Sequence, residues 1–441
     1  MAPLTLTVTG RASKRGLIPR QPPADRLIAG IETWLRLEYA DLVRSSRTRT
    51  SSTGAWGLLV GLHPAGEEFA ISASDEGDVT ISAQLAPVGP GYQTFVARLA
   101  QRIGLEHEIT WMSSGVEGDA EPDLAAAGDR TSVEQSYLTW LGGALIAARD
   151  ARRRGVGAIH VGTPANVVFT FEGAIATSLG PRDDAWLDAA LADSRLALDI
   201  TPWWADATDA RCFLNRALCL MWTDVRWRHP VDDAEQAVHE EVVRLLSRAF
   251  PLDPSLDYPW REWKELTSLR GSEDAMTRQV ATRAAKVPNG PLIGYRRDPV
   301  RILHEGWELE IPGGFSERRT EDEWFGAEAG RSITLAATQT GTVAGPMSAD
   351  DFLLQVAPDL GHDALTHRSG ELVGRARLST DASSGVEVGV LEGFSAVRGL
   401  GAAIRIVFDD SADWQWALEM WRSLLPAGRG AFTAARGSSA A

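Results

Sequence analysis

The strongest constraint in this sequence is a helical pattern across residues 208–266 that prolines divide into three parts. Apolar residues recur at helical spacing over 210–228 and again over 238–249. Pro230 ends the first helix, because proline has no amide proton and disfavours helix in the residue before it. Asp232, followed by a glutamate three residues later, is typical of a helix start. The stretch therefore predicts packed helices at the centre of a first domain.

Tryptophan is concentrated in and beside these helices, since six of the 16 Trp lie between Trp203 and Trp263. Asp257 and Pro259 start a third, short helix, on which Trp260 and Trp263 share a face. These indoles either pack the domain core or form an aromatic lip around a groove. The candidate binding residues are Trp203, Trp204, Trp260, Trp263 and Tyr92.

Length and composition favour a two-domain globular protein. A chain of 441 residues exceeds the usual size of one core. No run of about 18 apolar residues occurs, so we expect no membrane span. The N-terminal segment contains no apolar signal, which makes the cytoplasm the expected compartment. Cys212 and Cys219 are about 10 Å apart along one helix, too far for a disulfide.

The charge of the chain argues against a nucleic-acid partner. The net charge is −15, and acidic residues are in excess both before and after Asp298. Lysine occurs only at positions 14, 264 and 286, so arginine is the ordinary base of this chain. Arginine clusters are therefore weak indicators of a binding site here.

The sequence divides into two folded parts joined by a weakly patterned segment. The first part is predicted to be mixed α+β with a helical second half. The second is predicted to be a curved antiparallel sheet flanked by helices. The expected boundaries are a basic tail at 1–22, the first domain at 23–272, a linker at 273–297, the second domain at 298–426 and a disordered tail at 427–441.

Within these parts, periodicity and capping residues predict the individual elements. The predicted helices are 25–42, 95–104, 132–154, 183–191, 210–228, 232–249, 257–266, 348–357 and 413–425. The predicted strands are 56–62, 68–73, 78–85, 158–161, 167–171, 174–178, 195–200, 300–303, 307–311, 324–325, 332–338, 371–378, 386–391 and 402–408. Residues 4–8 form a short strand pattern inside the tail, and 113–130 is predicted to be a loop.

The second domain resembles the PsbP/Mog1/DcrB-like fold. The resemblance is based on two segments. One is a strand and turn over 307–315, which ends in Pro–x–Gly–Phe, and the other is a closing helix over 413–424 that is rich in Trp. The resemblance covers about a third of the chain. It implies a curved antiparallel sheet with helices at its sides, in a group of mostly non-catalytic binding proteins. These include chaperone-like partners of secreted effectors and lipoproteins, although no lipobox is visible in this sequence.

The known catalytic and metal motifs are incomplete. His239-Glu240 begins like a zinc-protease helix, but Val243 stands in place of the second histidine, so we expect no metal. Gly155-x-Gly157 follows a helix and lacks its third glycine, which excludes a dinucleotide motif. The sequence also contains no P-loop and no Gly–x–Ser–x–Gly elbow, and we expect no cofactor.

Two local features leave alternatives open. Gly89-Pro90-Gly91 before Tyr92 either cradles an anion at a helix start or makes an ordinary tight turn. His160, on a predicted strand, is either a structural histidine or a base that works with Asp199 or Glu172.

These observations favour a non-enzymatic cytoplasmic protein-binding module, such as an adaptor, an effector chaperone or an immunity-type protein. The alternative is an enzyme of unknown reaction with its site in the first domain around His160. A cleft with convergent polar groups would favour the enzyme, and an exposed apolar groove would favour the binding module. The sequence identifies neither the partner nor the oligomeric state.

Overall fold

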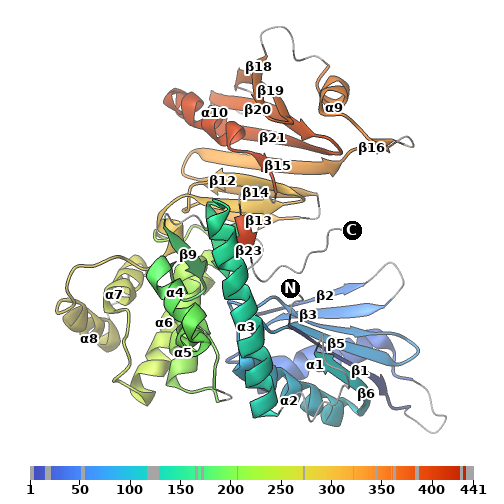
Figure 1. The fold of residues 1–441 in the computed structure, drawn as a ribbon, viewed down its shortest axis with the longest axis vertical. Helices are drawn as coiled ribbons and strands as arrows, with labels where there is room; N and C mark the ends of the chain where they lie inside the picture. The colour runs from blue at the N-terminus through green and yellow to red at the C-terminus, as the bar shows by residue number, and fades with distance from the viewer. Residues whose placement is uncertain are drawn as a thin grey trace.

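The protein has the expected α+β fold, with two lobes in a computed structural model (Figure 1). The N-terminal sheet and helices α1 to α8 form one lobe, and a large antiparallel sheet forms the other. The structure describes residues 4–14, 21–50, 55–116, 129–163, 167–169, 173–205, 207–271, 274–320, 322–342, 345–358, 360, 364–382, 387–427 and 431–433.

A six-stranded antiparallel sheet opens the chain, in the order β2–β3–β4–β5–β1–β6. Its strands are β1 (Thr5–Ala12), β2 (Ser45–Thr50), β3 (Trp56–Gly61), β4 (Phe69–Ala73), β5 (Asp78–Gln84) and β6 (Ile109–Val116). Helix α1 (Ala24–Glu38) packs on β3 and β4, and α2 (Pro90–His107) packs on β1 and β6. Alternate residues such as Leu6 and Val8 are buried beneath them, as a period of two requires.

The long helix α3 (Arg130–Arg153) lies between this sheet and the remaining helices (Figure 1). Asp129 caps it by accepting a hydrogen bond from the Ser132 amide at 3.0 Å. A small sheet follows in the order β10–β9–β7–β23, in which β7 pairs in parallel with both neighbours. Its strands are β7 (Ala158–Val161), β9 (Ala174–Thr177), β10 (Arg182–Asp183) and β23 (Ala431–Thr433), and α4 (Asp184–Ala192) and the 3₁₀ helix η2 (Ser194–Ile200) complete this region.

The proline-divided stretch forms the predicted helices around a core of their own. The elements are α5 (Ala210–Thr223), α6 (Asp233–Leu252), α7 (Trp260–Leu269), α8 (Ala275–Ala284) and the short 3₁₀ helix η3 (Tyr295–Arg297). Asp232 caps α6 by accepting a hydrogen bond from the Glu235 amide at 2.8 Å. Their shared apolar core contains Phe213, Leu246, Trp263 and Leu266.

The second lobe is built on a seven-stranded antiparallel sheet, as expected. In spatial order its strands are β13 (Ser316–Arg319), β14 (Glu323–Glu328), β15 (Arg331–Gln339), β21 (Leu400–Phe408), β20 (Val388–Val397), β19 (Leu372–Asp381) and β18 (Leu365–Ser369). Helix α9 (Ala349–Val356) packs on one face and α10 (Trp414–Arg422) on the other. Phe352 of α9 lies against Gly401, whereas Trp421 of α10 lies against Gly393, which points to the opposite face.

A four-stranded sheet joins the two lobes, because it takes strands from both. Its order is β22–β12–β11–β8. Strands β11 (Val300–His304), β12 (Trp307–Ile311) and β22 (Leu425–Pro426) belong to the second lobe, and β8 (Val167–Val168) comes from the first. A two-stranded ribbon, β16 (Gly341–Thr342) with β17 (Gly345–Pro346), lies apart from it. Phe169, after β8, is buried in the same apolar cluster as Trp307 and Ile404.

Buried ion pairs reinforce this junction. Glu317 on β13 lies 2.6 Å from Arg296 Nη2 and 3.3 Å from Arg226 Nη2. Arg226 and Arg228 also pair with Glu235 at the start of α6. The loop between α5 and α6 is thereby held against β13, an edge strand of the seven-stranded sheet.

Three predicted segments of the first lobe have a different structure. The tail predicted at 1–22 is wrong at residues 5–12, which form β1 between β5 and β6 and bury Leu6 and Val8 in the core; the strand pattern at 4–8 is confirmed. The predicted loop at 113–130 is wrong at its start, where β6 continues to Val116 and pairs with β1. The predicted strand at 195–200 is the 3₁₀ helix η2, whose first turn is capped by Asp193.

The predicted linker and C-terminal tail also contain ordered structure. Between residues 273 and 297 the chain forms α8, capped by Asp274, and then buries Tyr295 and Arg296. Within the tail, residues 431–433 form β23 and pair with β7. Among the described residues, no helix combines the length and apolar character needed to cross a bilayer.

Candidate functional site

The five predicted binding residues fall into two separate places. Tyr92 and Trp203 are buried in the core of the N-terminal sheet, with Trp204 beside them at its edge. Trp260 and Trp263 belong to the core formed by α5 to α8. The structure does not bring the two groups together into one groove.

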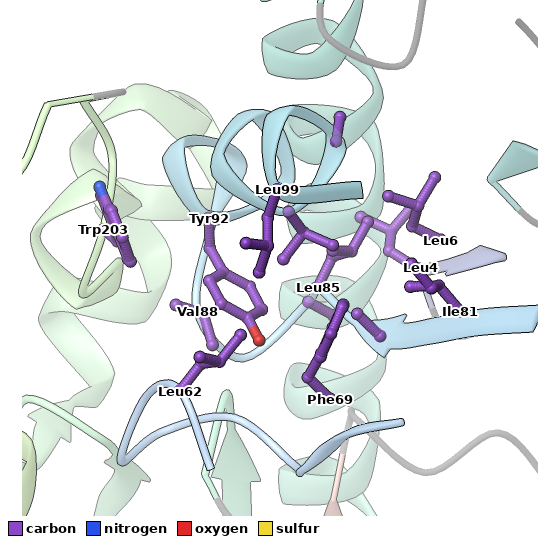
Figure 2. Packing of buried hydrophobic residues seen from close by; sticks show 14 of the residues in the cluster. Leu4, Leu6, Leu62, Phe69, Ile81, Leu85, Val88, Tyr92, Leu99 and Trp203 are labelled. Carbon is purple, nitrogen blue, oxygen red and sulfur yellow. The ribbon is translucent and has the colours of Figure 1, made fainter. Parts of the chain in front are cut away.

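Tyr92 and Trp203 meet at the start of α2, with ring centroids 5.9 Å apart (Figure 2). The Gly91 amide donates a hydrogen bond to the Trp203 carbonyl at 3.1 Å, and the Trp203 amide donates to the Val88 carbonyl at 2.9 Å. A Cβ on Gly91 would lie 2.1 Å from the Ala205 carbonyl oxygen, so glycine is needed for this close approach. The turn at 89–91 therefore receives a neighbouring segment of chain, and the anion-cradle interpretation is wrong.

Trp204 lines a pocket of about 430 Å³ beside the same segment. The pocket also contains Trp203, Asp209, Cys212 and Asn215. Trp204 is half-buried and carries the Arg130 guanidinium over its ring at 5.4 Å. Of the five predicted residues, Trp204 combines partial exposure with a position in a pocket.

Trp260 and Trp263 stack on each other, with centroids 5.4 Å apart and planes 12° from parallel. Trp263 is 0% exposed and packs against Phe250 and Tyr258. Trp260 is half-buried, and the Arg283 guanidinium lies over its ring at 5.0 Å. Trp263 is thus a core residue, and Trp260 forms the outer layer of the same stack.

His160 is buried, and its ring contacts Phe169 and Thr163. Its Nε2 lies 2.9 Å from the Phe169 carbonyl oxygen and 3.0 Å from the Phe169 amide, and its Nδ1 lies 3.1 Å from Thr163 Oγ1. Asp199, its predicted partner, instead accepts hydrogen bonds from Arg182 Nε at 3.0 Å and Trp186 Nε1 at 3.2 Å. Glu172 lies outside the described residues. This arrangement links the end of β7 to Phe169, the residue after β8.

His239, in the incomplete zinc motif, lies on α6 with Nε2 3.2 Å from the Arg226 carbonyl oxygen. Burial lowers its pKa. In the part of the chain that the structure describes, no group of three His, Cys, Asp or Glu side chains is arranged to hold a metal ion.

A groove on the second lobe is formed by the end of β19, the start of β20, the end of β21 and the start of α10. Its volume is about 990 Å³. Its apolar lining comes from Leu378, Val388, Phe408 and Trp414. Leu378 is 42% exposed and Trp414 is 48% exposed. A Cβ on Gly389 would lie 2.2 Å from the Phe408 ring, so the absence of a side chain there lets Phe408 form the floor.

Acidic side chains edge this groove. Glu387, Asp409 and Asp410 line it together with the apolar residues. Asp410 accepts a hydrogen bond from the Ala412 amide at 2.8 Å. Among the described residues, Glu387 and Asp409 have no basic partner.

An ion pair holds the wall of the groove. Asp413 accepts two hydrogen bonds from Arg331, one of them from Nε at 2.7 Å, and these bonds lower the pKa of Asp413. The Arg331 guanidinium also lies 4.8 Å from the Trp416 ring centroid. The first turn of α10, which carries Trp414, is therefore anchored to β15.

The sequence did not single out this groove. Leu378, Gly389 and Phe408 come from three strands and meet only through the register of the sheet. The sequence placed Trp414 only in the closing helix. Helical periodicity predicts which face of a helix is buried, but it does not predict which end of the helix remains exposed to solvent. The available signal was the acidic run at 409–413 directly before a tryptophan.

Comparison with known proteins assigns no family to this chain. No family model matches it, and no curated protein matches it. Among solved structures, a protein from Bacteroides thetaiotaomicron VPI-5482, determined by crystallography at 1.50 Å, matches 28% of this chain and 46% of its own. The identity is 10% and the TM-score is 0.24, which is too low to support an argument about fold or function. This chain therefore spans less than half the length of that protein.

Proposed function

We propose that this chain is a non-enzymatic protein-binding module, of adaptor, effector-chaperone or immunity type, that takes a basic segment of its partner into the groove beside α10. One observation carries the proposal. The groove places a half-exposed indole, Trp414, and an exposed Leu378 beside the carboxylates of Glu387 and Asp409, which have no basic partner in the described part of the chain. An apolar floor with acidic edges is complementary to a segment that alternates apolar residues with lysine or arginine.

The size and composition of the groove support this kind of ligand. A volume of about 990 Å³ is enough for several side chains but small for a folded domain. Tryptophan is enriched among the residues that dominate binding energy at protein interfaces. Burial of the Trp414 indole and the Leu378 side chain by a ligand would stabilise the complex. The acidic side chains would orient a basic ligand and raise its association rate.

The expected compartment is the cytoplasm. Cys212 and Cys219 are both buried free thiols, and burial raises their pKa, that of Cys212 to about 12. Thiols in this state suit a reducing compartment. The resemblance of the second lobe to the PsbP/Mog1/DcrB-like fold, whose members mostly bind other proteins, agrees with this function and remains part of the proposal.

The proposal is tested by peptide binding to the full-length protein. An array of 15-residue peptides that varies charge and apolar content identifies a fluorescent probe peptide, whose affinity is then measured by anisotropy. We expect basic, apolar-rich peptides to bind and their acidic counterparts not to bind. Trp414→Ala is expected to weaken binding about 30-fold, which corresponds to about 2 kcal/mol. The double variant E387Q/D409N is expected to weaken it and to reduce its dependence on salt.

The matched control is Leu354→Ala, because Leu354 is 63% exposed on α9, on the opposite face of the sheet. Hydrogen exchange gives an independent readout, with protection by the peptide expected at 378–380, 387–389 and 408–414. A peptide that binds Trp414→Ala as tightly as the native protein, or that protects a different surface, would rule out the groove as the binding site.

A further inference from the structure

A second group of polar side chains lies in the interior, between the N-terminal sheet and helices α5 and α6. It consists of Arg44, His63, Tyr92, Arg216 and Glu241, and we refer to these five residues as the buried polar centre. The Arg216 side chain is 0% exposed. His63 and Tyr92 are also fully buried, with ring centroids 6.4 Å apart. A buried arginine beside a buried histidine and tyrosine is costly unless its donors are satisfied.

The hydrogen bonds of Arg216 account for only one of its three nitrogens. Its Nη2 donates to the Leu42 carbonyl at 3.4 Å and lies 3.5 Å from Glu241 Oε1. Its Nε and Nη1 are buried and have no hydrogen-bond partner within the described structure. A guanidinium presents its donors as a fork, and here one side of the fork is unused.

His63 and Tyr92 add further unused donors. His63 Nδ1 accepts a hydrogen bond from the Ala65 amide at 3.1 Å, so the proton of the neutral ring is on Nε2. Nε2 is buried and has no acceptor among the described residues, and the same is true of the Tyr92 hydroxyl. Figure 2 shows this hydroxyl pointing toward Leu62, the residue directly before His63. Burial and the nearby charges of Arg216 and Arg44 hold the pKa of His63 well below its usual value, so the ring stays neutral.

The charge of the buried polar centre is positive. Arg44 Nε lies 3.6 Å from Glu241 Oε2, so Arg44 and Arg216 share a single carboxylate. Arg244 lies 3.9 Å from the same Glu241 and 3.6 Å from Asp41 at the surface. The unused groups of Arg216, His63 and Tyr92 can all donate a hydrogen bond, and Glu241 balances only one of the two positive charges of Arg216 and the partly exposed Arg44. This chemistry fits an acceptor-rich anion and disfavours a cation.

We propose that the buried polar centre is a binding site for a small oxyanion of the phosphate or sulfate class, held by the Arg216 guanidinium, the Tyr92 hydroxyl and His63 Nε2. The bound anion would connect the 62–66 turn, the first turn of α2 and helix α5, and so would tie the N-terminal sheet to the helices. This site is separate from the groove beside α10, and either proposal stands if the other fails.

A neighbouring pocket provides the route to this site. The pocket of about 430 Å³ is lined by Trp203, Cys212 and Asn215, and Asn215 precedes Arg216 on α5. Trp203 also packs on His63, with ring centroids 6.1 Å apart, as well as on Tyr92. Its indole nitrogen is turned away from the Tyr92 hydroxyl (Figure 2). A displacement of the Trp203 indole would connect the pocket with the buried polar centre, so the oxyanion is either free or the end group of a small metabolite that occupies the pocket.

The test uses the full-length protein and inorganic phosphate and sulfate as probes. Calorimetry is expected to show binding of one oxyanion per chain, and thermal melts are expected to rise with phosphate but not with chloride. Tyr92→Phe keeps the packing and removes one donor, so it is expected to weaken phosphate binding about tenfold. Arg216→Met is expected to abolish binding if the variant folds. The matched control is Tyr137→Phe, which removes a buried hydroxyl bonded to Thr201 Oγ1 at 3.0 Å and is expected to leave phosphate affinity unchanged.

The origin of the anion is tested on protein purified without phosphate or sulfate buffers. Denaturation followed by ion chromatography and mass spectrometry is expected to release either the inorganic ion or an organic phosphate or sulfate, and both results support the site. Two results would overturn the proposal. One is the absence of both a released oxyanion and binding at millimolar phosphate. The other is binding that Tyr92→Phe leaves unchanged, which would indicate an adventitious ion only.

Discussion

Phe169 stacks on Tyr295, with ring centroids 4.5 Å apart and planes 17° from parallel, and this pair joins the two lobes. Phe169 follows β8, the strand of the first lobe that pairs with β11 of the second. Tyr295 lies in the segment between the lobes, and its hydroxyl binds the backbone of Thr177. The junction is therefore packed and hydrogen-bonded like a domain interior, and these contacts hold the two lobes together.

Removal of the Tyr295 hydroxyl is expected to destabilise this junction. The hydroxyl donates to the Thr177 carbonyl at 3.0 Å and accepts from the Thr177 amide at 3.0 Å, and all of these atoms are buried. Tyr295→Phe removes both of these hydrogen bonds, although the Thr177 carbonyl keeps a second one from the Gly180 amide at 3.1 Å, and should lower the free energy of unfolding by about 1–3 kcal/mol. Denaturant titration checks this, with Tyr39→Phe as the control because its hydroxyl binds the exposed Arg102. Equal effects of the two variants would contradict the prediction.

The buried carboxylate of Glu317 should make stability depend on pH. Burial disfavours its charged form, but the charges of Arg296 and Arg226 outweigh this effect and lower the pKa of Glu317 below its usual value of 4.5. A group whose folded pKa is lowered contributes stability above its unfolded pKa, and this contribution is lost as the pH falls through the folded value. Native stability is therefore expected to decline below about pH 4.5.

Glu317→Gln isolates this contribution. The substitution removes the carboxylate that pairs with Arg296 and one of the two that pair with Arg226, and it should cost about 3–5 kcal/mol at pH 7. The difference from the native protein should shrink as the pH falls through the lowered folded pKa of Glu317, because the native carboxylate is then protonated as well. The control is Glu392→Gln, at an exposed pair with Arg377, which should cost less than about 1 kcal/mol. A cost for Glu317→Gln that does not change with pH would show that the lost stability is not electrostatic.

The stacked pair Trp260 and Trp263 should respond unequally to truncation. Trp263 is 0% exposed, so Trp263→Ala removes a full indole from the core and should cost about 3–5 kcal/mol. Trp260→Ala should cost less, because that ring is half-buried and partly covered by Arg283. Thermal melts of the two variants check the order. If Trp263→Ala melts at the same temperature as the native protein, Trp263 does not stabilise the core of α5 to α8.

The sequence predicted helices better than strands, and the reason is local. The α6 helix has its cap, its apolar spacing and its terminating prolines within 25 residues of chain, so each signal confirms the others. Strand β1 carries the alternation of Leu6 and Val8, but its neighbours β5 and β6 are far along the chain. Nothing near residues 5–12 indicates that pairing, so the strand pattern at 4–8 was kept inside the predicted tail.

The candidate sites were harder to predict than the fold, because both depend on long-range pairing. Tyr92 and Trp203 were predicted from the sequence to be binding residues, and in the structure they are neighbours in the core. In the sequence, nothing distinguishes Arg216 from other arginines on helices. Its role becomes visible only in the structure, where its charge acts on the buried His63. Likewise, the acids of the groove become significant only when sheet register places them beside Leu378 and Trp414.

Proteolysis tests how independent the lobes are. The weak pattern at 273–297 predicts cleavage there and a stable fragment that begins near residue 298. The structure supports a different outcome, because such a fragment lacks β8, Tyr295 and the Arg296 that pairs with Glu317. We expect that cleavage between 271 and 298 leaves the two pieces associated, so that they separate on a denaturing gel but elute together from a sizing column. A C-terminal piece that elutes alone with a cooperative melt would show that β11 to α10 fold without the first lobe, as the sequence pattern predicts.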